Sequence, residues 1–505
     1  MKKTLKAITL LLVFAMLLSA FAACAKKDGM DGDTDGTVTT SSSSSDEPSA
    51  EEAENKPEEK KYDYTYTILS SENGGDVPLY IYLENKPSGE VISNALYRRQ
   101  ELMSATYGVT LALNLDSNPI ETLTTTGTSG DYVCDVTTIN ARNTLTLAQQ
   151  GYYHNILDFQ DSIKLDATYW DQRIQNEYRI NDMLFTLEGD YTYNDEMRTM
   201  VVIYNDKIYN DNGYTEKYGT PYTMVDNDEW TYETMMEMII DMAWDSSSDN
   251  KMNEDDTWGM VSELTATYYF LLGAGLKTMT NVNGELTLQV NDKTQYERLY
   301  NVIEKTMTMA DNKDIIMANG GAITVENAWG AASDIFETDR ALFRTTTLSA
   351  VNRLTDMKSD YGILPIPQYY DDQTEYYCWV SGVSATPLAI SRFVPDATVT
   401  AEITERLCYH SRYGEDTLYS AFFDQMAYSR ICRSAEDIKM LELVIESKTF
   451  DLDQAANITG IEAAMYSLAK AKNFTAISST ISSKVTAAGT ALDSYLITMI
   501  ANNVK

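Results

Sequence analysis

A short acidic string, 245–256, has the spacing of a metal-binding loop. Oxygen-bearing side chains stand at its positions one, three, five, nine and twelve: Asp245, Ser247, Asp249, Asn253 and Asp256. The backbone carbonyl of Lys251 falls at position seven, which completes the ligand order of an EF-hand-like calcium loop. Position six is Asn rather than Gly, and position twelve is Asp rather than Glu. The string therefore predicts either a structural Ca²⁺ site or a solvated acidic turn. Apart from this possible Ca²⁺, we expect the protein to require no cofactor.

Motifs of enzyme chemistry are scarce in this chain. The two histidines, His154 and His410, do not lie in an HExxH motif. The sequence has neither a GxSxG elbow nor a GxxxxGK[ST] phosphate loop. With 75 acidic residues, a pair of carboxylates for glycoside hydrolysis stays open. The motifs therefore favour a chain that is not an enzyme, with a surface enzyme acting on glycans as an alternative.

The N-terminus has the features of an export signal. Lys2, Lys3 and Lys6 flank the start of an uncharged apolar run at 7–20, which is short for a membrane span. The small residues at 22 and 23 precede Cys24, so we predict a signal peptide over 1–23 and lipidation of Cys24. Ordinary cleavage after an Ala-x-Ala-like site and an uncleaved anchor are the alternatives. Residues 24–61 are rich in Ser, Asp, Glu and Lys with little to bury, which predicts a disordered tether. The protein is then held by lipid at the extracellular face of the membrane.

Charge and cysteine usage narrow the function further. The chain has 39 basic and 75 acidic residues and a net charge of −36, which disfavours nucleic acid and suits a neutral or cationic ligand. Four cysteines besides Cys24 form no CxxC pair, so zinc is not expected and buried free thiols are favoured over a disulfide. They are Cys134, Cys378, Cys408 and Cys432. We expect a monomer with no nucleic-acid partner.

Strand and helix patterns alternate after residue 61. β-forming runs at 62–69, 109–115 and 131–139 surround a helical pattern at 93–107. This order predicts an α/β fold with a mostly parallel sheet. Polar residues directly after strands are candidates for ligand binding. Glu72 follows the first strand, and Asn140 and Arg142 follow the third.

Four segments in order resemble the extracellular solute-binding proteins of carbohydrate-type ABC transporters, the superfamily of maltose-binding protein. They are VVIYNDKIYNDNGY at 201–214, DEWTYETMMEMIIDMAWD at 228–245, DIFETDRALFRTTTLSAVNRL at 334–354 and DYGILPIPQY at 360–369. Thr338 and Asp339 stand where the family usually has Gly. The resemblance extends over roughly 60–440 of the chain.

The resemblance implies a two-lobed, type II periplasmic-binding-protein-like fold with a helical C-terminal part. The solute lies in a cleft between the lobes, and the closed receptor delivers it to the permease subunits of an ABC transporter. By the family pattern the chain crosses between lobes near 186–193, near Ile335 and near Ala385. Lobe 1 then comprises 62–185 and 336–385, and lobe 2 comprises 186–335 and 386–505.

Further candidates for ligand binding follow from these crossings. Asp190, Tyr191 and Tyr193 lie at the first crossing and Trp329 precedes the second. Thr346 and Thr347 follow a strand, and Tyr377 and Trp379 lead into the third crossing. Sugars bind to aromatic platforms together with carboxylates, amides and Arg, so a mono- or oligosaccharide is the expected small-molecule solute. Each Trp could instead pack in the core. A peptide or polyamine ligand stays open as well, and so does a sensor that does not transport.

Overall fold

The computed structural model describes residues 49–72, 81–82 and 89–504. The chain divides into two units, 1–49 and 50–505, and the account below concerns the second. The signal peptide and the lipidation of Cys24 lie outside the described residues and stay predictions. In the part of the chain that is described, no helix combines the length and apolar character needed to cross a membrane.

The first sheet has the strand order β12-β3-β1-β2. Its central strand β1 (Tyr64–Ser71) is parallel to β2 (Val109–Asp116) and β3 (Val136–Thr138), while β12 (Leu388–Ile390) joins antiparallel to β3. Three helices pack on it, α3 (Val91–Tyr107), α4 (Pro119–Ser129) and α16 (Ala397–Arg412), and α5 (Ala141–Gln149) follows β3 in the chain. Tyr66 and Ile68 of β1 face a core shared with α16. The alternation of strands and helices thus builds the predicted parallel sheet.

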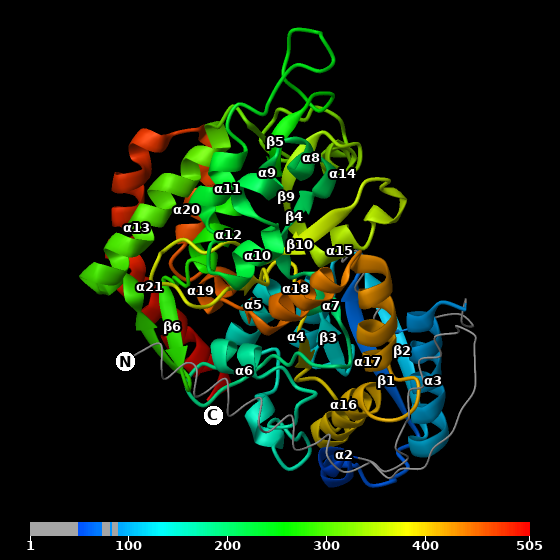
Figure 1. The fold of residues 1–505 in the computed structure, drawn as a ribbon. Coiled ribbons are helices and arrows are strands. Elements are labelled where there is room, and N and C mark those ends of the chain that lie inside the picture. The colour runs from blue at the N-terminus through cyan, green and yellow to red at the C-terminus, as the bar shows by residue number, and fades with distance from the viewer. Residues whose placement is uncertain (1–48, 73–80, 83–88, 505) are drawn as a thin grey trace, which may run out of the picture. The chain divides into compact units, whose positions relative to one another are not determined.

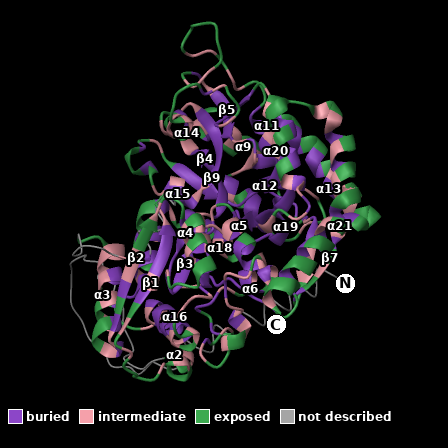
Figure 2. Cartoon of the chain, turned by 180° about the vertical axis from the view of Figure 1, so that it is seen from behind, coloured by how far each residue is buried: buried purple, intermediate pink, exposed green. Residues whose placement is uncertain are grey.

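The second sheet has the order β10-β4-β9-β5-β8 (Figure 1). Its strands are β4 (Met200–Asn205), β5 (Trp258–Ser262), β8 (Ile315–Met317), β9 (Ala341–Thr347) and β10 (Tyr361–Leu364). β5 is parallel to β8 and β9, and β4 is antiparallel to β9 and β10. Nearly every residue of these strands is buried, as the purple strands of Figure 2 show. Continuous apolar runs such as MVVIYN in β4 are typical of strands covered on both faces.

Helices and a hairpin surround the second sheet. The helices are α8 (Asp206–Asp211), α9 (Tyr214–Tyr218), α10 (Pro221–Asp226), α11 (Tyr232–Met238), α12 (Ala266–Gly273), α13 (Lys293–Met307), α14 (Ala328–Glu337) and α15 (Leu348–Val351). The hairpin pairs β6 (Met279–Val282) with β7 (Glu285–Leu288). The start of α11 is capped, since the Thr231 hydroxyl accepts a hydrogen bond from the Thr234 N–H at 3.1 Å.

Two antiparallel stretches link the sheets. Leu187 forms a β-bridge with Leu388, and Thr199 forms one with Val380. We call the stretches between these bridges, 188–199 and 380–387, the two connecting segments. The first includes the short helix α7 (Asn194–Met197), and the second follows β11 (Cys378–Trp379), which pairs with β13 (Lys448–Thr449). Two of the predicted crossings, near 186–193 and near Ala385, therefore lie where the chain passes between sheets.

The C-terminal part is helical, as expected. After α16 come α17 (Leu418–Ser420), a π-helix at Ala421–Ile431 and α18 (Ala435–Glu446). They are followed by α19 (Leu452–Ala456), α20 (Ile461–Ala471) and α21 (Ile477–Asn503). α18 packs on β10 of the second sheet, whereas α19 and α21 pack on α5 beside the first. The four cysteines of the described part are free and buried, which confirms the expectation of buried thiols.

The predicted lobe boundaries after residue 335 are wrong. The family pattern places 336–385 in the first lobe, yet β9 is hydrogen-bonded between β4 and β5 of the second sheet. It places 386–505 in the second lobe, yet β12 and α16 belong to the first sheet and its core. Ile335, the expected return point, is buried within α14. A strand pattern predicts a strand, but its hydrogen-bond partners decide which sheet it joins.

The predicted tether is ordered over its last part. Residues 50–55 form the helix α2 (Ala50–Asn55). The Tyr409 hydroxyl donates to the Glu52 carbonyl at 3.0 Å, and the Thr168 N–H donates to the Glu51 carboxylate at 2.9 Å. Further along, Lys60 pairs with Glu402 at 2.7 Å. The segment contains few apolar side chains, which is why its composition predicted disorder. It is held instead by polar contacts with residues far away in the sequence.

Candidate functional site

A cavity of about 630 Å³ lies at the carboxyl ends of β5 and β9, next to both connecting segments. In open α/β sheets this edge is where ligands commonly bind. We call it the strand-end cavity. Its wall is formed by Arg198, Met200, Glu263, Thr265, Tyr269, Asn319, Asn327, Trp329, Gly330, Ser333, Asp334, Glu337, Arg344, Thr345, Thr346, Thr347, Ala350, Arg353, Trp379, Ser381, Val383, Ser384, Gln454 and Glu462.

Aromatic rings at two depths line the strand-end cavity. Trp379 is buried, and its ring lies 5.4 Å from Tyr268 and 5.1 Å from Tyr269 between centroids. The Trp379 indole N–H has no hydrogen-bond partner among the described residues. Trp329 is 52% exposed at the start of α14. One ring therefore forms part of the wall, while the other is free to contact a molecule that enters.

A buried arginine and a buried glutamate lie in the same wall. Arg344 of β9 is 4% exposed, and its Nη1 atom finds no hydrogen-bond partner in the described part of the chain. Burial lowers the Arg344 pKa to about 10, and burial raises the pKa of the Glu263 carboxyl to about 7. The guanidinium offers donors, and the carboxyl group offers an acceptor. A buried donor without a partner is costly, so a ligand oxygen that accepts from Arg344 would offset that cost.

The C-terminal helices close one edge of the cavity. The Gln454 side chain accepts a hydrogen bond from the Gly382 N–H at 2.9 Å, which ties α19 to the second connecting segment. Arg142 donates to the Gln454 carbonyl at 2.7 Å and lies 3.4 Å from the Glu462 carboxylate. The backbone N–H of Arg142 also donates to the Gly382 carbonyl at 2.9 Å. Arg142 thus supports two lining residues from the first sheet's side.

Four of the residues predicted from the sequence meet in this cavity. They are Trp329, Thr346, Thr347 and Trp379. Thr347 also caps α15, because its hydroxyl accepts the Ala350 N–H at 3.4 Å. Arg344 and Glu263 were missed. Each had a signal in the sequence, since Arg344 is the one charged residue of the strand ALFRTTT and Glu263 directly follows the strand WGMVS.

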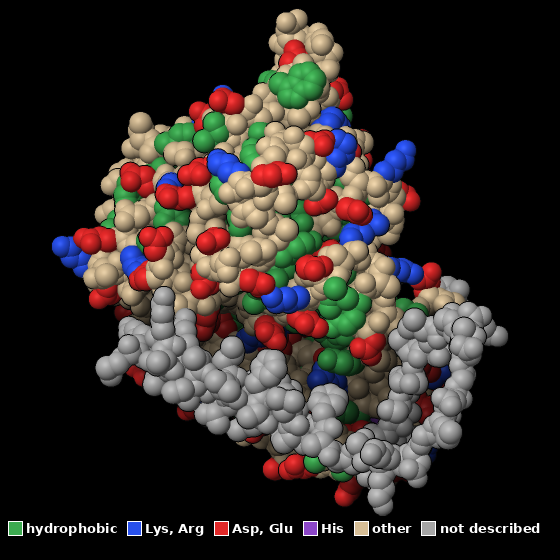
Figure 3. All heavy atoms as spheres, in the orientation of Figure 1, with side chains coloured by type: hydrophobic (Ala, Val, Ile, Leu, Met, Phe, Trp, Pro, Cys, Tyr) green, Lys and Arg blue, Asp and Glu red, His purple; other side chains and the backbone are tan. Residues whose placement is uncertain are grey.

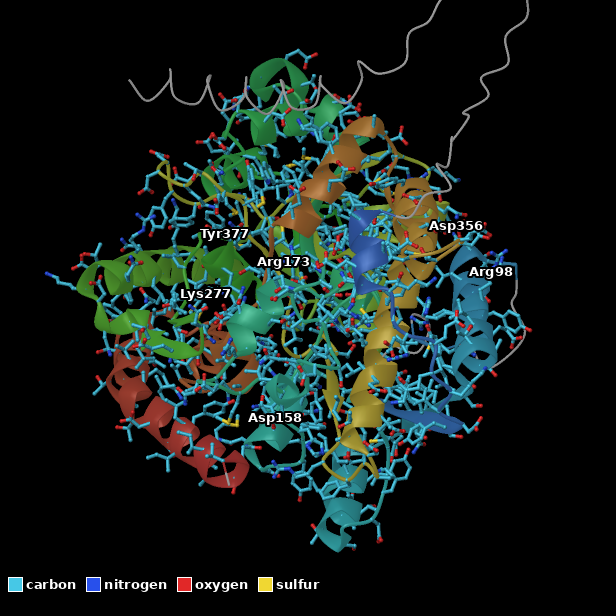
Figure 4. All side chains as sticks on the ribbon, turned by 90° about the horizontal axis from the view of Figure 1, so that it is seen from below. Arg98, Asp158, Arg173, Lys277, Asp356 and Tyr377 are labelled. Carbon is cyan, nitrogen blue, oxygen red and sulfur yellow. The ribbon has the colours of Figure 1, made fainter. Side chains whose placement is uncertain are left out.

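Three further predicted residues, Glu72, Asn140 and Tyr377, lie outside the strand-end cavity. Glu72 is exposed at the end of β1. Asn140 caps α5, where its side chain accepts the Asn143 N–H at 2.9 Å. Tyr377 donates to Glu375 at 3.0 Å and lines a different pocket together with Lys277, and both are labelled in Figure 4. A residue that follows a strand lies in a cleft only when that end of the strand borders the cleft.

The predicted residues of the first connecting segment also face elsewhere. Tyr193 is buried and stacks on Phe422, with ring centroids 4.4 Å apart and planes 7° from parallel. Tyr191 is buried as well, and its hydroxyl donates to the Leu187 carbonyl at 3.2 Å. Asp190 lies 3.2 Å from Arg412 in a second cavity. The tyrosine predictions are therefore corrected, because both rings serve as core.

The acidic string 245–256 forms a turn that satisfies its own carboxylates. Asp245 accepts the N–H of Asn250 at 2.8 Å, and Asp249 accepts that of Lys251 at 2.8 Å. Asp256 accepts the N–H groups of Ser247 at 3.0 Å and Asn253 at 2.9 Å. Over the described ranges, three or more His, Cys, Asp or Glu side chains are nowhere grouped so as to hold a metal ion. The Ca²⁺ expectation stays a prediction.

Comparison with known proteins identifies the fold. No family model and no curated protein matches the sequence. The solved structures that resemble it include two with 12% identity and a TM-score of 0.52 each. One is a cyclo/maltodextrin-binding protein complexed with maltotetraose, matched over 87% of this chain and 98% of that one. The other is an ABC substrate-binding protein from Listeria monocytogenes in complex with cycloalternan, matched over 84% and 99%. The chain therefore has the two-lobed periplasmic-binding-protein-like α/β fold.

Proposed function

We propose that this chain is the substrate-capturing receptor of an ABC importer and binds a mono- or oligosaccharide in the strand-end cavity. The observation that carries the proposal is the wall of that cavity. It combines the aromatic rings of Trp329, Trp379 and Tyr269 with buried hydrogen-bonding groups on Arg344 and Glu263. A sugar presents apolar C–H faces and a rim of hydroxyl groups, which these two kinds of side chain match.

The balance of charge in the cavity also supports a neutral, hydroxyl-rich ligand. Three arginines, Arg198, Arg344 and Arg353, lie in the wall with four carboxyl groups, those of Glu263, Asp334, Glu337 and Glu462. A hydroxyl group donates and accepts, so it can use guanidinium and carboxylate partners at once. The similar structures support the same ligand class, because their bound molecules are maltotetraose and cycloalternan.

The rest of the proposal follows from the N-terminal sequence and the fold. The receptor is lipid-anchored through Cys24 on the extracellular face of the membrane, acts as a monomer and passes its solute to permease subunits. The two antiparallel connecting segments support closure of the lobes around the solute, since two short links allow a hinge motion. Both similar structures are binding proteins, which supports capture without turnover.

Isothermal titration calorimetry of the purified full-length chain with maltotetraose and with cycloalternan tests the sugar proposal. Saturable heat from either ligand is expected, together with a raised melting temperature. At 100 times its dissociation constant the ligand should stabilise the fold by about 2.7 kcal/mol. Chromatography of the same mixtures should recover the sugar intact. Release of shorter sugars would make the chain an enzyme, and no binding across a wider panel of neutral sugars would refute the proposal.

A further inference from the structure

A second cavity, of about 620 Å³, shares no lining residue with the strand-end cavity. Its wall comes from the start of α6 (Gln172–Tyr178), the first connecting segment, the end of α16, the π-helix and α18. In Figure 3 a hollow lies below the place of α17 and α18 in Figure 1, with acidic and apolar side chains gathered at its upper edge. We call it the acidic cavity.

Carboxylates outnumber cations in this wall. Six acidic residues line it, and the two basic ones are Arg173 and Arg412. Arg173, labelled in Figure 4, is bound on two sides by Asp171, with Nη2–Oδ2 at 2.6 Å and Nε–Oδ1 at 2.9 Å. Arg412 pairs with Asp190 and lies over the Tyr419 ring, 3.8 Å from its centroid. Both guanidinium groups are therefore already engaged by the protein itself.

The floor of the acidic cavity is a buried ionic cluster. The Lys448 ammonium lies 3.1 Å from Asp171 and also contacts Asp195 and Glu196. One ammonium thus serves three carboxyl groups. Glu196 is only 8% exposed, and its Oε2 atom has no hydrogen-bond partner among the described residues. A buried carboxyl oxygen without a partner is unfavourable unless something else supplies a donor.

We propose that the acidic cavity binds an organic ammonium ion. Its N–H groups donate to Glu196 and the neighbouring carboxylates, and its carbon chain lies against Tyr419, Phe423 and Tyr428. Aromatic faces attract cations, and the Arg412–Tyr419 stack uses the same interaction in this wall. A metal ion fits less well, because the described carboxylates include no group arranged to hold one.

Binding at this site is coupled to release of a proton. Burial and the adjacent Asp195 raise the pKa of Glu196 well above its ordinary value, so the carboxyl of the free protein holds its proton to a higher pH than an exposed glutamate does. The charged and titratable groups around Glu196 include Asp195 of α7, Lys448 of β13, Asp171 and Arg173 near the start of α6, and Glu188 and Tyr193 of the first connecting segment. An arriving ammonium favours the ionised carboxylate, so affinity should rise with pH.

Calorimetry of the full-length chain with putrescine tests the site, and 1,4-butanediol is the uncharged control of equal length. We expect putrescine to bind at one site and the diol to give no heat. A proton released on binding is taken up by the buffer, so the heat measured with putrescine should change with the ionisation enthalpy of the buffer. Putrescine that gives no heat at neutral or alkaline pH would overturn the proposal.

Variants locate the bound ammonium. Glu196→Gln should weaken putrescine binding at least tenfold and abolish the proton release. The double variant Glu442→Gln/Glu446→Gln changes only exposed lining residues, and it should weaken binding severalfold even if Glu196→Gln folds poorly. Glu436→Gln, on α18 but outside the wall, should change nothing. Putrescine affinity that stays unchanged in the first two variants would place the ligand elsewhere and refute the site.

Discussion

The strand-end cavity and the acidic cavity have nearly the same volume, about 630 and 620 Å³, but opposite chemical character. The first mixes three arginines with four acids and holds two tryptophans. The second has six acids against two arginines that are already paired. Both adjoin the first connecting segment, which contributes Arg198 to one and Glu196 to the other. Volume therefore says little about the ligand, whereas the balance of donors and acceptors in the wall says much.

The largest effect is expected from removing the cation beneath the acidic cavity. Lys448→Met leaves three buried carboxyl groups without their ammonium, so the free energy of unfolding should fall by about 3–5 kcal/mol. Urea unfolding followed by circular dichroism measures the loss.

Lys439→Met is the matched control for this prediction. Lys439 pairs with Asp226 at the surface, and such exposed pairs contribute about 0–1 kcal/mol. If the two variants were equally stable, the ionic cluster around Lys448 would not stabilise the fold, and the account of the carboxyl groups beneath the acidic cavity would be wrong.

A smaller effect, confined to sugar binding, is expected from the other cavity. Arg344→Met keeps the length of the side chain but removes the donors, so oligosaccharide binding should weaken by about 1.5–3 kcal/mol, or about one to two orders of magnitude. Calorimetry with maltotetraose and putrescine on the same variant separates the cavities, since putrescine affinity should not change.

Arg98→Met provides the control for the strand-end cavity. Arg98 is exposed on α3, lines neither cavity and pairs with Asp416. The variant should bind both probes like the parent chain. Loss of putrescine binding in Arg344→Met would show that one cavity takes both ligands, and the comparison between them would fail.

The pH dependence of stability gives the next effect. Glu188 is fully buried beside the cluster, and burial followed by Asp195 and Glu196 raises its pKa well above 4.5. The folded state keeps this proton at pH values where the unfolded state releases it, so this group's contribution falls as pH rises above 4.5. The loss is at most about 1.4 kcal/mol per pH unit.

Glu188→Gln removes that titration. The free energy of unfolding of the variant should rise steadily relative to that of the parent chain from pH 5 to pH 7. Below the pKa of the unfolded state, the two free energies should change with pH at nearly the same slope. Urea midpoints measured at each pH test this. Parallel stability curves for the two proteins would mean that Glu188 titrates normally.

The smallest effect concerns the acidic turn 245–256, which is far from the chemistry of either cavity. Calcium would have to displace the N–H groups that Asp245, Asp249 and Asp256 accept, so we expect binding no tighter than about 10⁻³ M. Calorimetry with millimolar CaCl₂ measures it, and sugar and putrescine affinities should stay unchanged. The absence of heat would leave this string as a turn held by its own hydrogen bonds.

The sequence by itself determined the elements and the fold class. Strands and helices near 62–69, 93–107 and 109–115 follow from side-chain periodicity, which is a local property. The segments that resemble the family predicted the two-lobed fold. Thr346 and Thr347 were candidates because they follow a strand, and Trp329 and Trp379 because they lie near the family's crossings; all four line one cavity. Buried free cysteines were favoured because the four thiols form no CxxC pair.

Only the tertiary structure decided which surfaces these elements share. β9 joins the second sheet because β4 and β5 supply its hydrogen bonds, and no pattern within ALFRTTT names those partners. Tyr193 is core because Phe422, more than two hundred residues away in sequence, stacks on it. The acidic cavity likewise gathers Asp171, Glu196 and Lys448 from distant segments. Which distant residues come into contact depends on the path of the whole chain, so the local sequence around each residue does not determine its partner.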